Sequence, residues 1–161
     1  MSNTGIIYGI NGPVIYLKGD NGFKISEMVY VGPEHLVGEI IGLKKGMTTV
    51  QVFEETTGLK PGDTVTGTGD AISVLLGPGI IHNIFDGIQR PLEEIAKASG
   101  KYISRGVSVD SLDTEKKWKT HITVKEGDVV GPGSIIAETQ ETDSILHKSM
   151  VPPNLTEATV I

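Results

Sequence analysis

The chain has 161 residues, a net charge of −6 and no cysteine. It therefore lacks the basic face with which a general nucleic-acid binder neutralises phosphates, and disulfides, cysteine-ligated zinc and thiol catalysis are excluded. The 21 glycines and eight prolines indicate many turns, which suit short strands, and no stretch approaches the ~20 apolar residues of a membrane helix.

Residues 1–70 show the alternation of side chains that is typical of short strands. In the stretch GIIYGI, for example, Ile6, Tyr8 and Ile10 share one face of an extended chain. Five or six such strands without a helix predict a mainly β fold that begins with a small closed β-barrel or a sandwich. Closure would also remove the exposed edges of the sheet.

Three turns are predicted between these strands. The Gly-Asp-Asn-Gly sequence at residues 19–22 predicts a tight hairpin, because Asn-Gly accepts the positive φ that such a turn requires. Lys45 and Gly46 are expected at the turn of a second hairpin. Pro61 and Gly62 are expected in a turn before the last strand of the region.

Residues 71–116 form a mixed central segment in which strict alternation is lost. A short helix is predicted over residues 91–99, because Pro91 is tolerated in the first turn and Glu93 and Glu94 favour the positive end of the helix dipole. Gly100 can close this helix as a left-handed cap. The chain after the helix is predicted to be an extended connector.

Residues 117–161 return to a strand pattern and predict a second β module. The stretch WKTHITV is followed by a turn at residues 125–128 and by the strands SIIAETQ and ILHKSMV. We place the domain boundaries at 1–70, 71–116 and 117–161, and we expect the last module to be incomplete.

The sequence contains no motif that carries catalysis on its own. The phosphate loop GxxxxGK[ST] and the dinucleotide fingerprint GxGxxG are absent. Adjacent carboxylates, such as Glu93 and Glu94, point in different directions and make no acid–base pair. His82 lies in an apolar stretch and is expected to be a packed, hydrogen-bonded side chain. The histidines are too scattered to form a metal-ligand pair: His35, His82, His121 and His147. We predict no catalytic, cofactor-binding or metal-binding residue in this chain.

Residues 124–153 resemble the barrel-sandwich pattern of biotin and lipoate carriers. A carrier presents its modified lysine at the tip of an acidic hairpin, where a modifying enzyme reaches it. Here the tip reads Glu-Thr-Asp-Ser at residues 141–144, so Ser144 stands in the place of the lysine, and Lys148 falls in the return strand. This favours a structural or docking module over a carrier that uses Lys148; an unrelated β-domain adaptor is the third alternative.

Two stretches together resemble one family: QVFEETTGLKPGDTVTGTG at residues 51–69 and LGPGIIHNIFDGIQRPLE at residues 76–93. They are similar to the N-terminal portion of the catalytic A subunit of V-type and A-type rotary ATPases. YISRGV, LDTEKKW and QETDSILHKSMVPP match the bulge region that distinguishes this subunit from its non-catalytic partner.

This resemblance implies a parent subunit that hydrolyses or synthesises ATP, with Mg, while protons or sodium ions move. The residues that bind nucleotide would lie downstream of this chain, so the parent subunit would be an enzyme, whereas no catalytic residue is expected in this chain alone. The implied partners are other A subunits and the non-catalytic B subunit, in a hexameric ring, with the bulge contacting the peripheral stalk. The implied location is cytoplasmic, on the soluble head of the ATPase.

Within the central segment, the resemblance implies roles for three residues at the start of the nucleotide-binding domain. Gly77 and Gly79 would permit a close backbone approach, or would serve turn geometry alone. Arg90 would pair with a carboxylate of the remaining subunit, or would be a solvated charge.

Overall fold

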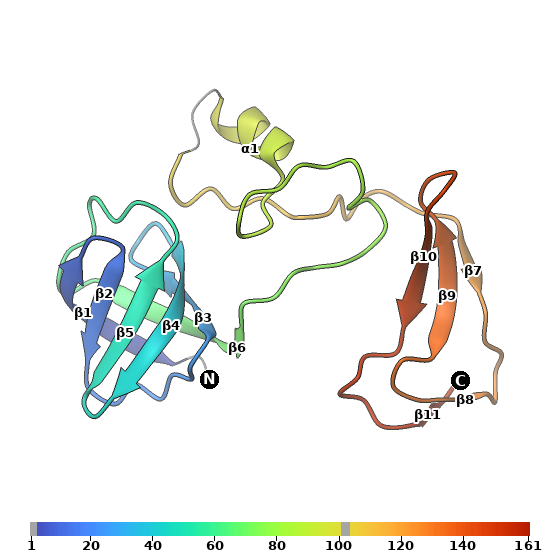
Figure 1. Cartoon of the computed structure of the whole chain (residues 1–161), viewed down its shortest axis with the longest axis horizontal. Helices are drawn as coiled ribbons and strands as arrows, with labels where there is room; N and C mark the ends of the chain where they lie inside the picture. The colour runs from blue at the N-terminus through green and yellow to red at the C-terminus, as the bar shows by residue number, and fades with distance from the viewer. Residues whose placement is uncertain (1–2, 101–103) are drawn as a thin grey trace. The chain divides into compact units, whose positions relative to one another are not determined.

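The computed structural model describes residues 3–100 and 104–161, so that Tyr102 and Ile103 of the YISRGV motif lie outside the described residues (Figure 1). The chain divides into two compact units. The first comprises the described residues up to Val74 together with those of Ile95–Ser108, and the second comprises Leu75–Glu94 and Val109–Ile161.

The first unit contains a closed antiparallel barrel, which confirms the predicted barrel (Figure 1). The strands close in the order β1-β2-β5-β4-β3-β6, and β1 pairs with β6 to complete the ring. Their bounds are β1 Thr4–Asn11, β2 Val14–Lys18, β3 Glu27–Val31, β4 Leu36–Lys44, β5 Met47–Val52 and β6 Thr64–Ala71.

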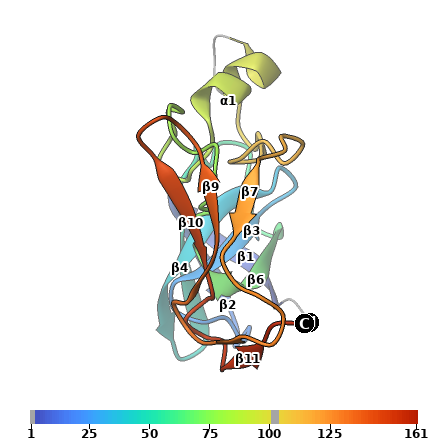
Figure 2. The ribbon, with the colours of Figure 1, turned by 90° about the vertical axis from the view of Figure 1, so that its right-hand side faces the viewer.

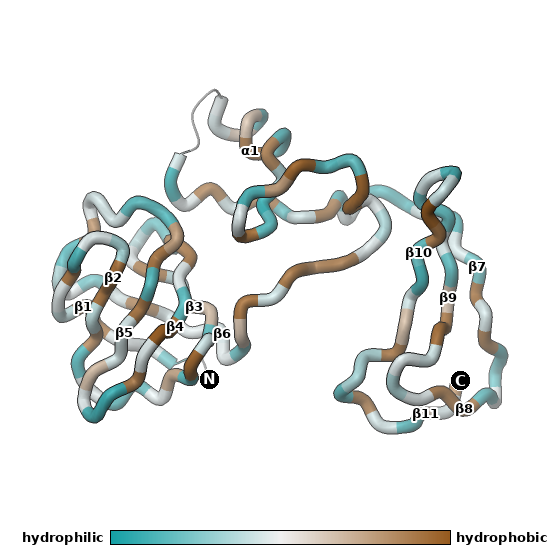
Figure 3. The backbone as a smooth tube through the Cα atoms, in the orientation of Figure 1, coloured by the Kyte–Doolittle hydropathy of each residue, from teal (hydrophilic) through white to brown (hydrophobic). Residues whose placement is uncertain are grey.

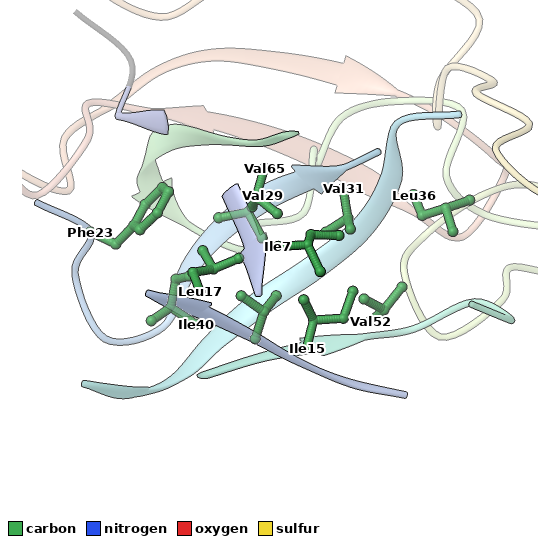
Figure 4. Packing of buried hydrophobic residues seen from close by; sticks show 11 residues of the cluster. Ile7, Ile15, Leu17, Phe23, Val29, Val31, Leu36, Ile40, Val52 and Val65 are labelled. Carbon is green, nitrogen blue, oxygen red and sulfur yellow. The ribbon is translucent and has the colours of Figure 1, made fainter. Parts of the chain in front are cut away.

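The core of the barrel is built mostly by alternate residues of its strands, because successive side chains of a strand point to opposite faces. A bulge between Ile7 and Gly9 breaks this alternation in β1, so Ile10 packs against the core and the prediction that it shares a face with Ile6 and Tyr8 is wrong. In β1, Ile7 is buried while Ile6 and Tyr8 on either side are 53% and 60% exposed. Figure 4 shows the inward side chains meeting inside the barrel. Eleven buried residues form this cluster: Ile7, Ile15, Leu17, Phe23, Val29, Val31, Leu36, Ile40, Val50, Val52 and Val65.

One predicted hairpin is confirmed and one is wrong. β4 and β5 pair directly through the turn at Lys45 and Gly46, where Gly46 has a φ of 75°. The hairpin predicted at residues 19–22 does not form, because β2 pairs with β1 and β5 whereas β3 pairs with β4 and β6. Residues 19–22 instead begin a crossover. Asn-Gly indicates a local turn, but it does not determine which strands β2 and β3 pair with.

Glu27 is a buried carboxylate at the start of β3, only 1% exposed. Its Oε2 atom accepts a hydrogen bond from the Lys24 N–H at 2.8 Å, and its Oε1 atom accepts one from the Gly69 N–H at 3.0 Å. The side chain therefore joins the β2–β3 crossover to β6 and offsets the cost of its own burial with two charge-assisted hydrogen bonds.

The connector returns to the barrel at Arg105 and Gly106. The Arg105 guanidinium donates to the Glu34 carboxylate, with 3.1 Å between Nη2 and Oε1, and the Gly106 N–H donates to Glu54 Oε2 at 3.0 Å. Gly106 has a φ of 67°, and a Cβ atom there would collide with the Glu34 carbonyl. Only glycine can approach the β3–β4 turn this closely.

The predicted short helix is confirmed as α1, Leu92–Ser99, which follows Pro91 directly. Glu93 and Glu94 lie in its first turn. Gly100 adopts a φ of 78°, and its N–H donates to the Ala96 carbonyl at 2.9 Å, as expected of a left-handed cap.

The second unit carries two small antiparallel sheets. Figure 2 shows β10, β9 and β7 side by side in the three-stranded sheet, and the other sheet pairs β11 with β8. The turn expected at residues 125–128 is present, with the Lys125 N–H donating to Asp128 Oδ2 at 2.8 Å. The strand bounds are β7 Thr120–Ile122, β8 Val129–Val130, β9 Ile135–Gln140, β10 Leu146–Met150 and β11 Ala158–Thr159.

Candidate functional site

The central loop, defined here as residues 75–92, is closed at its base by one glutamine side chain. Gln89 Oε1 accepts from the Leu75 N–H at 2.8 Å, and Gln89 Nε2 donates to the Leu75 carbonyl at 2.8 Å, so the side-chain amide pairs with both backbone groups of one residue. The Leu92 N–H also donates to the Ile84 carbonyl at 2.8 Å. The segment that the sequence could describe only as mixed is thus a closed loop with its own hydrogen bonds.

Asp86 organises the turn within this loop. Its Oδ1 atom accepts from the backbone N–H groups of Ile88 at 3.1 Å and Arg90 at 2.8 Å, and its Oδ2 atom accepts from Arg90 Nε at 2.8 Å. Burial raises the pKa of Asp86, but the hydrogen bonds from Arg90 and Ile88 and the charge of Arg90 together hold it below its ordinary value. Arg90 therefore has a carboxylate partner inside this chain.

Gly77 and Gly79 both lie next to side chains from the segment that precedes β7. Gly77 is buried, and a Cβ atom there would lie 3.0 Å from Leu112 Cδ1. Gly79 has a φ of 102°, a left-handed conformation that favours glycine, and a Cβ atom there would lie 3.4 Å from Trp118 Cζ2. These two glycines let the central loop pack directly on the residues that lead into β7.

Lys148 lies in β10, as the sequence predicts for the return strand, where its cross-strand partner is Glu138. The tip between β9 and β10 is closed by the Glu141 N–H, which donates to the Ile145 carbonyl at 3.0 Å. A swinging arm needs its lysine at that tip. The geometry therefore disfavours the carrier alternative.

The prediction of a packed His82 is wrong. His82 is exposed and has a φ of 72°. The apolar neighbours in the sequence therefore do not enclose the His82 ring, because Ile81 and Ile84 are themselves 40% and 69% exposed. Among residues 3–100 and 104–161, no group of three or more histidine or acidic side chains is placed to hold a metal ion.

The outer barrel face, defined here as Ile6, Tyr8, Tyr16, Ile41 and Met47, is the candidate contact surface. The register connects the outward sides of β1, β2, β5 and β4: Gly9 faces Tyr16, Tyr16 faces Thr49, and Thr49 faces Gly42. The Lys18 ammonium lies 5.4 Å from the centre of the Tyr8 ring. Several large apolar side chains are thus exposed to solvent on four neighbouring strands. Such a patch is typical of a surface that contacts another protein.

A second apolar stretch follows β6. Ile72, Val74, Leu75 and Leu76 are 38%, 59%, 57% and 69% exposed. Figure 3 shows the chain from the end of β6 into the start of the central loop as mostly hydrophobic. No helix in the described ranges is long and apolar enough to cross a membrane.

Two family models match the chain. Residues 7–69 match the β-barrel domain of the ATP synthase alpha/beta family, and residues 109–161 match the barrel-sandwich domain of ATP synthase alpha/beta subunits. The two matches cover β2 to β5, most of β1 and β6, and all strands of the second unit.

Close relatives carry the same region. The chain is 51% identical over 155 residues to the V-type ATP synthase alpha chain of Halothermothrix orenii and 49% identical over 157 residues to the A subunit of the A-type ATP synthase of Methanopyrus kandleri. Each comparison covers 96% of this chain and 26% of the relative, so the chain spans about a quarter of the length of the curated relatives it matches. The chain belongs to the ATP synthase alpha/beta family and is homologous to the N-terminal region of the A subunit of its V-type and A-type members.

Proposed function

We propose that this chain serves ring assembly and subunit docking as the N-terminal part of the A subunit of a V-type or A-type rotary ATPase. The outer barrel face is the observation that carries the proposal. Apart from the half-buried Tyr16, its members are exposed, and they lie on a barrel whose core is already filled by other side chains. In a ring of alternating subunits they would be covered by a neighbour.

The complete subunit would couple ATP hydrolysis or synthesis to proton or sodium movement, with ATP and Mg bound outside these 161 residues. The GxxxxGK[ST] pattern is absent from the sequence, and the two matched domains are a barrel and a barrel-sandwich. The partners would be further A subunits and the non-catalytic B subunit, on a cytoplasmic head peripheral to the membrane. The second unit would dock the peripheral stalk.

Sedimentation velocity of the 161-residue chain mixed with the B subunit of the same source tests the proposal. We expect a complex that Tyr8→Asp and Ile41→Asp each weaken by at least about tenfold, because a charge would have to be buried without a partner. Leu155→Asp is the matched control, since Leu155 is similarly exposed at 53% but lies in the second unit. Absence of a complex, or equal weakening by all three variants, would count against assembly through this face.

A further inference from the structure

A side chain at the tip between β9 and β10 binds the backbone of the central loop, which lies much earlier in the sequence. Glu141 Oε1 accepts hydrogen bonds from the Gly79 N–H at 2.7 Å and from the Ile81 N–H at 3.0 Å. The pairs are 62 and 60 positions apart, yet all three residues belong to the same compact unit. One carboxylate oxygen therefore bridges two segments that no strand pairing joins.

The central loop is shaped to present these two N–H groups together. The left-handed Gly79 turns the chain so that the amides of Gly79 and Ile81 converge on one point. Asn83 Nδ2 donates to the Gly79 carbonyl at 2.6 Å and holds the turn from inside the loop. Leu112 and Trp118 pack beside Gly77 and Gly79. The loop thus presents the two N–H groups as a donor pair to one carboxylate oxygen.

The tip between β9 and β10 is also held by hydrogen bonds of its own. Gln140 Nε2 donates to the Thr142 carbonyl at 2.5 Å and to the Ile145 carbonyl at 3.2 Å. The Ile145 N–H donates in turn to Thr142 Oγ1 at 3.1 Å. Since these hydrogen bonds hold the backbone of the tip, binding of the carboxylate to the loop has to order only the Glu141 side chain.

We propose that Glu141 is a positioning residue that latches the β9–β10 tip to the central loop, so that the two segments move as one body. A carboxylate that accepts two backbone N–H groups makes charge-assisted hydrogen bonds, which are stronger than neutral ones. The central loop leads along the chain into α1. A protein that binds the tip would therefore also restrain the loop that precedes the helix. The latch rests on these contacts alone and is independent of the proposed function.

Amide hydrogen exchange in the 161-residue chain, measured residue by residue by NMR, tests the latch. In Glu141→Ala, exchange at Gly79 and Ile81 should accelerate by about tenfold or more, because both amides lose their acceptor. Amides of β9 should keep their rates. Glu141→Gln retains an acceptor oxygen without the charge and should give a smaller acceleration. Glu126→Ala is the control, since Glu126 is an exposed acid in the turn at residues 125–128.

Two results would overturn the latch. Unchanged exchange at Gly79 and Ile81 in Glu141→Ala would show that the carboxylate does not hold them. Loss of the whole β10-β9-β7 sheet in both Glu141 variants would also contradict it, because the proposal assigns Glu141 to the junction and not to the sheet. Acceleration confined to the two loop amides, absent in Glu126→Ala, is the result that supports it.

Discussion

At the scale of single residues, carboxylates that bind backbone amides hold the irregular parts of this chain. Glu27 joins the β2–β3 crossover to β6, Asp86 closes the turn of the central loop, and Glu54 holds the returning connector. In each case the acceptor oxygens of the side chain replace the strand partners that loops lack. Replacing such an acid, or crowding it, should therefore loosen the segment that it holds.

Asp86→Asn should destabilise the second unit by about 1–2 kcal/mol at pH 7, because an amide accepts hydrogen bonds from Arg90 more weakly than a carboxylate. The pKa of Asp86 is lowered in the folded chain, so its stabilisation is complete above the unfolded value of about 4 and is lost as pH falls through the folded value. Urea unfolding at pH 7 and at about pH 3 should show the difference from wild type shrinking. Asp110→Asn, at an exposed acid of the same unit, is the control variant.

Gly67→Ala should destabilise the barrel by about 1–3 kcal/mol, because the new methyl group would collide with the Glu27 carboxylate and lie 2.9 Å from the Phe23 ring. Gly9→Ala is the matched control. Gly9 also lies in a barrel strand without a positive φ, but a Cβ atom there would lie 4.0 Å from its nearest neighbour. Urea unfolding followed by circular dichroism measures both; equal stability of the two variants would contradict the tight packing of Gly67 on Glu27.

At the scale of elements, the alternation within strands was sufficient to predict the barrel, because burial of one face is a property of each strand alone. Pairing is different. The prediction of a β2–β3 hairpin is wrong because β2 pairs in the closed ring with β5, which lies about thirty residues further along the chain. The helix was predicted correctly from Pro91, Glu93 and Gly100, whose effects are confined to one or two turns.

The register of β1 can be tested with two adjacent residues of the same type. Ile7→Ala should cost about 2–4 kcal/mol of unfolding free energy, because Ile7 is 2% exposed and its loss leaves a cavity. Ile6→Ala should cost less than about 1 kcal/mol, since Ile6 is 53% exposed. Similar costs for the two variants in urea unfolding would mean that β1 does not present alternate faces.

At the scale of the whole molecule, the family resemblance found in the sequence was confirmed, whereas the long-range polar contacts were not foreseen. The sequence predicts Glu141 only as part of the acidic tip. No residue near it indicates that its carboxylate accepts hydrogen bonds from the N–H groups of Gly79 and Ile81. Backbone amides have no residue-specific signature, so such contacts become visible only when the loop conformation is known.

The 161-residue chain should not bind ATP–Mg with micromolar affinity. The sequence lacks the GxxxxGK[ST] loop whose backbone N–H groups and lysine hold the phosphates. Isothermal titration should give no heat of binding beyond dilution, while a complete A subunit of a relative, titrated in parallel, serves as the positive control. A micromolar dissociation constant for this chain would contradict the prediction, because it would require a nucleotide-binding site that no motif in the sequence indicates.

The pairing of β1 with β6 has a consequence for synthesis on the ribosome. Thr4 pairs with Thr66, so the contact that completes the ring cannot form until more than sixty residues have emerged. Until then β1 and β3 are the two outermost strands of an open, curved sheet, because both take β6 as a neighbour in the finished ring. Translation through β6 is thus the step that ends the exposure of both strands to other nascent chains.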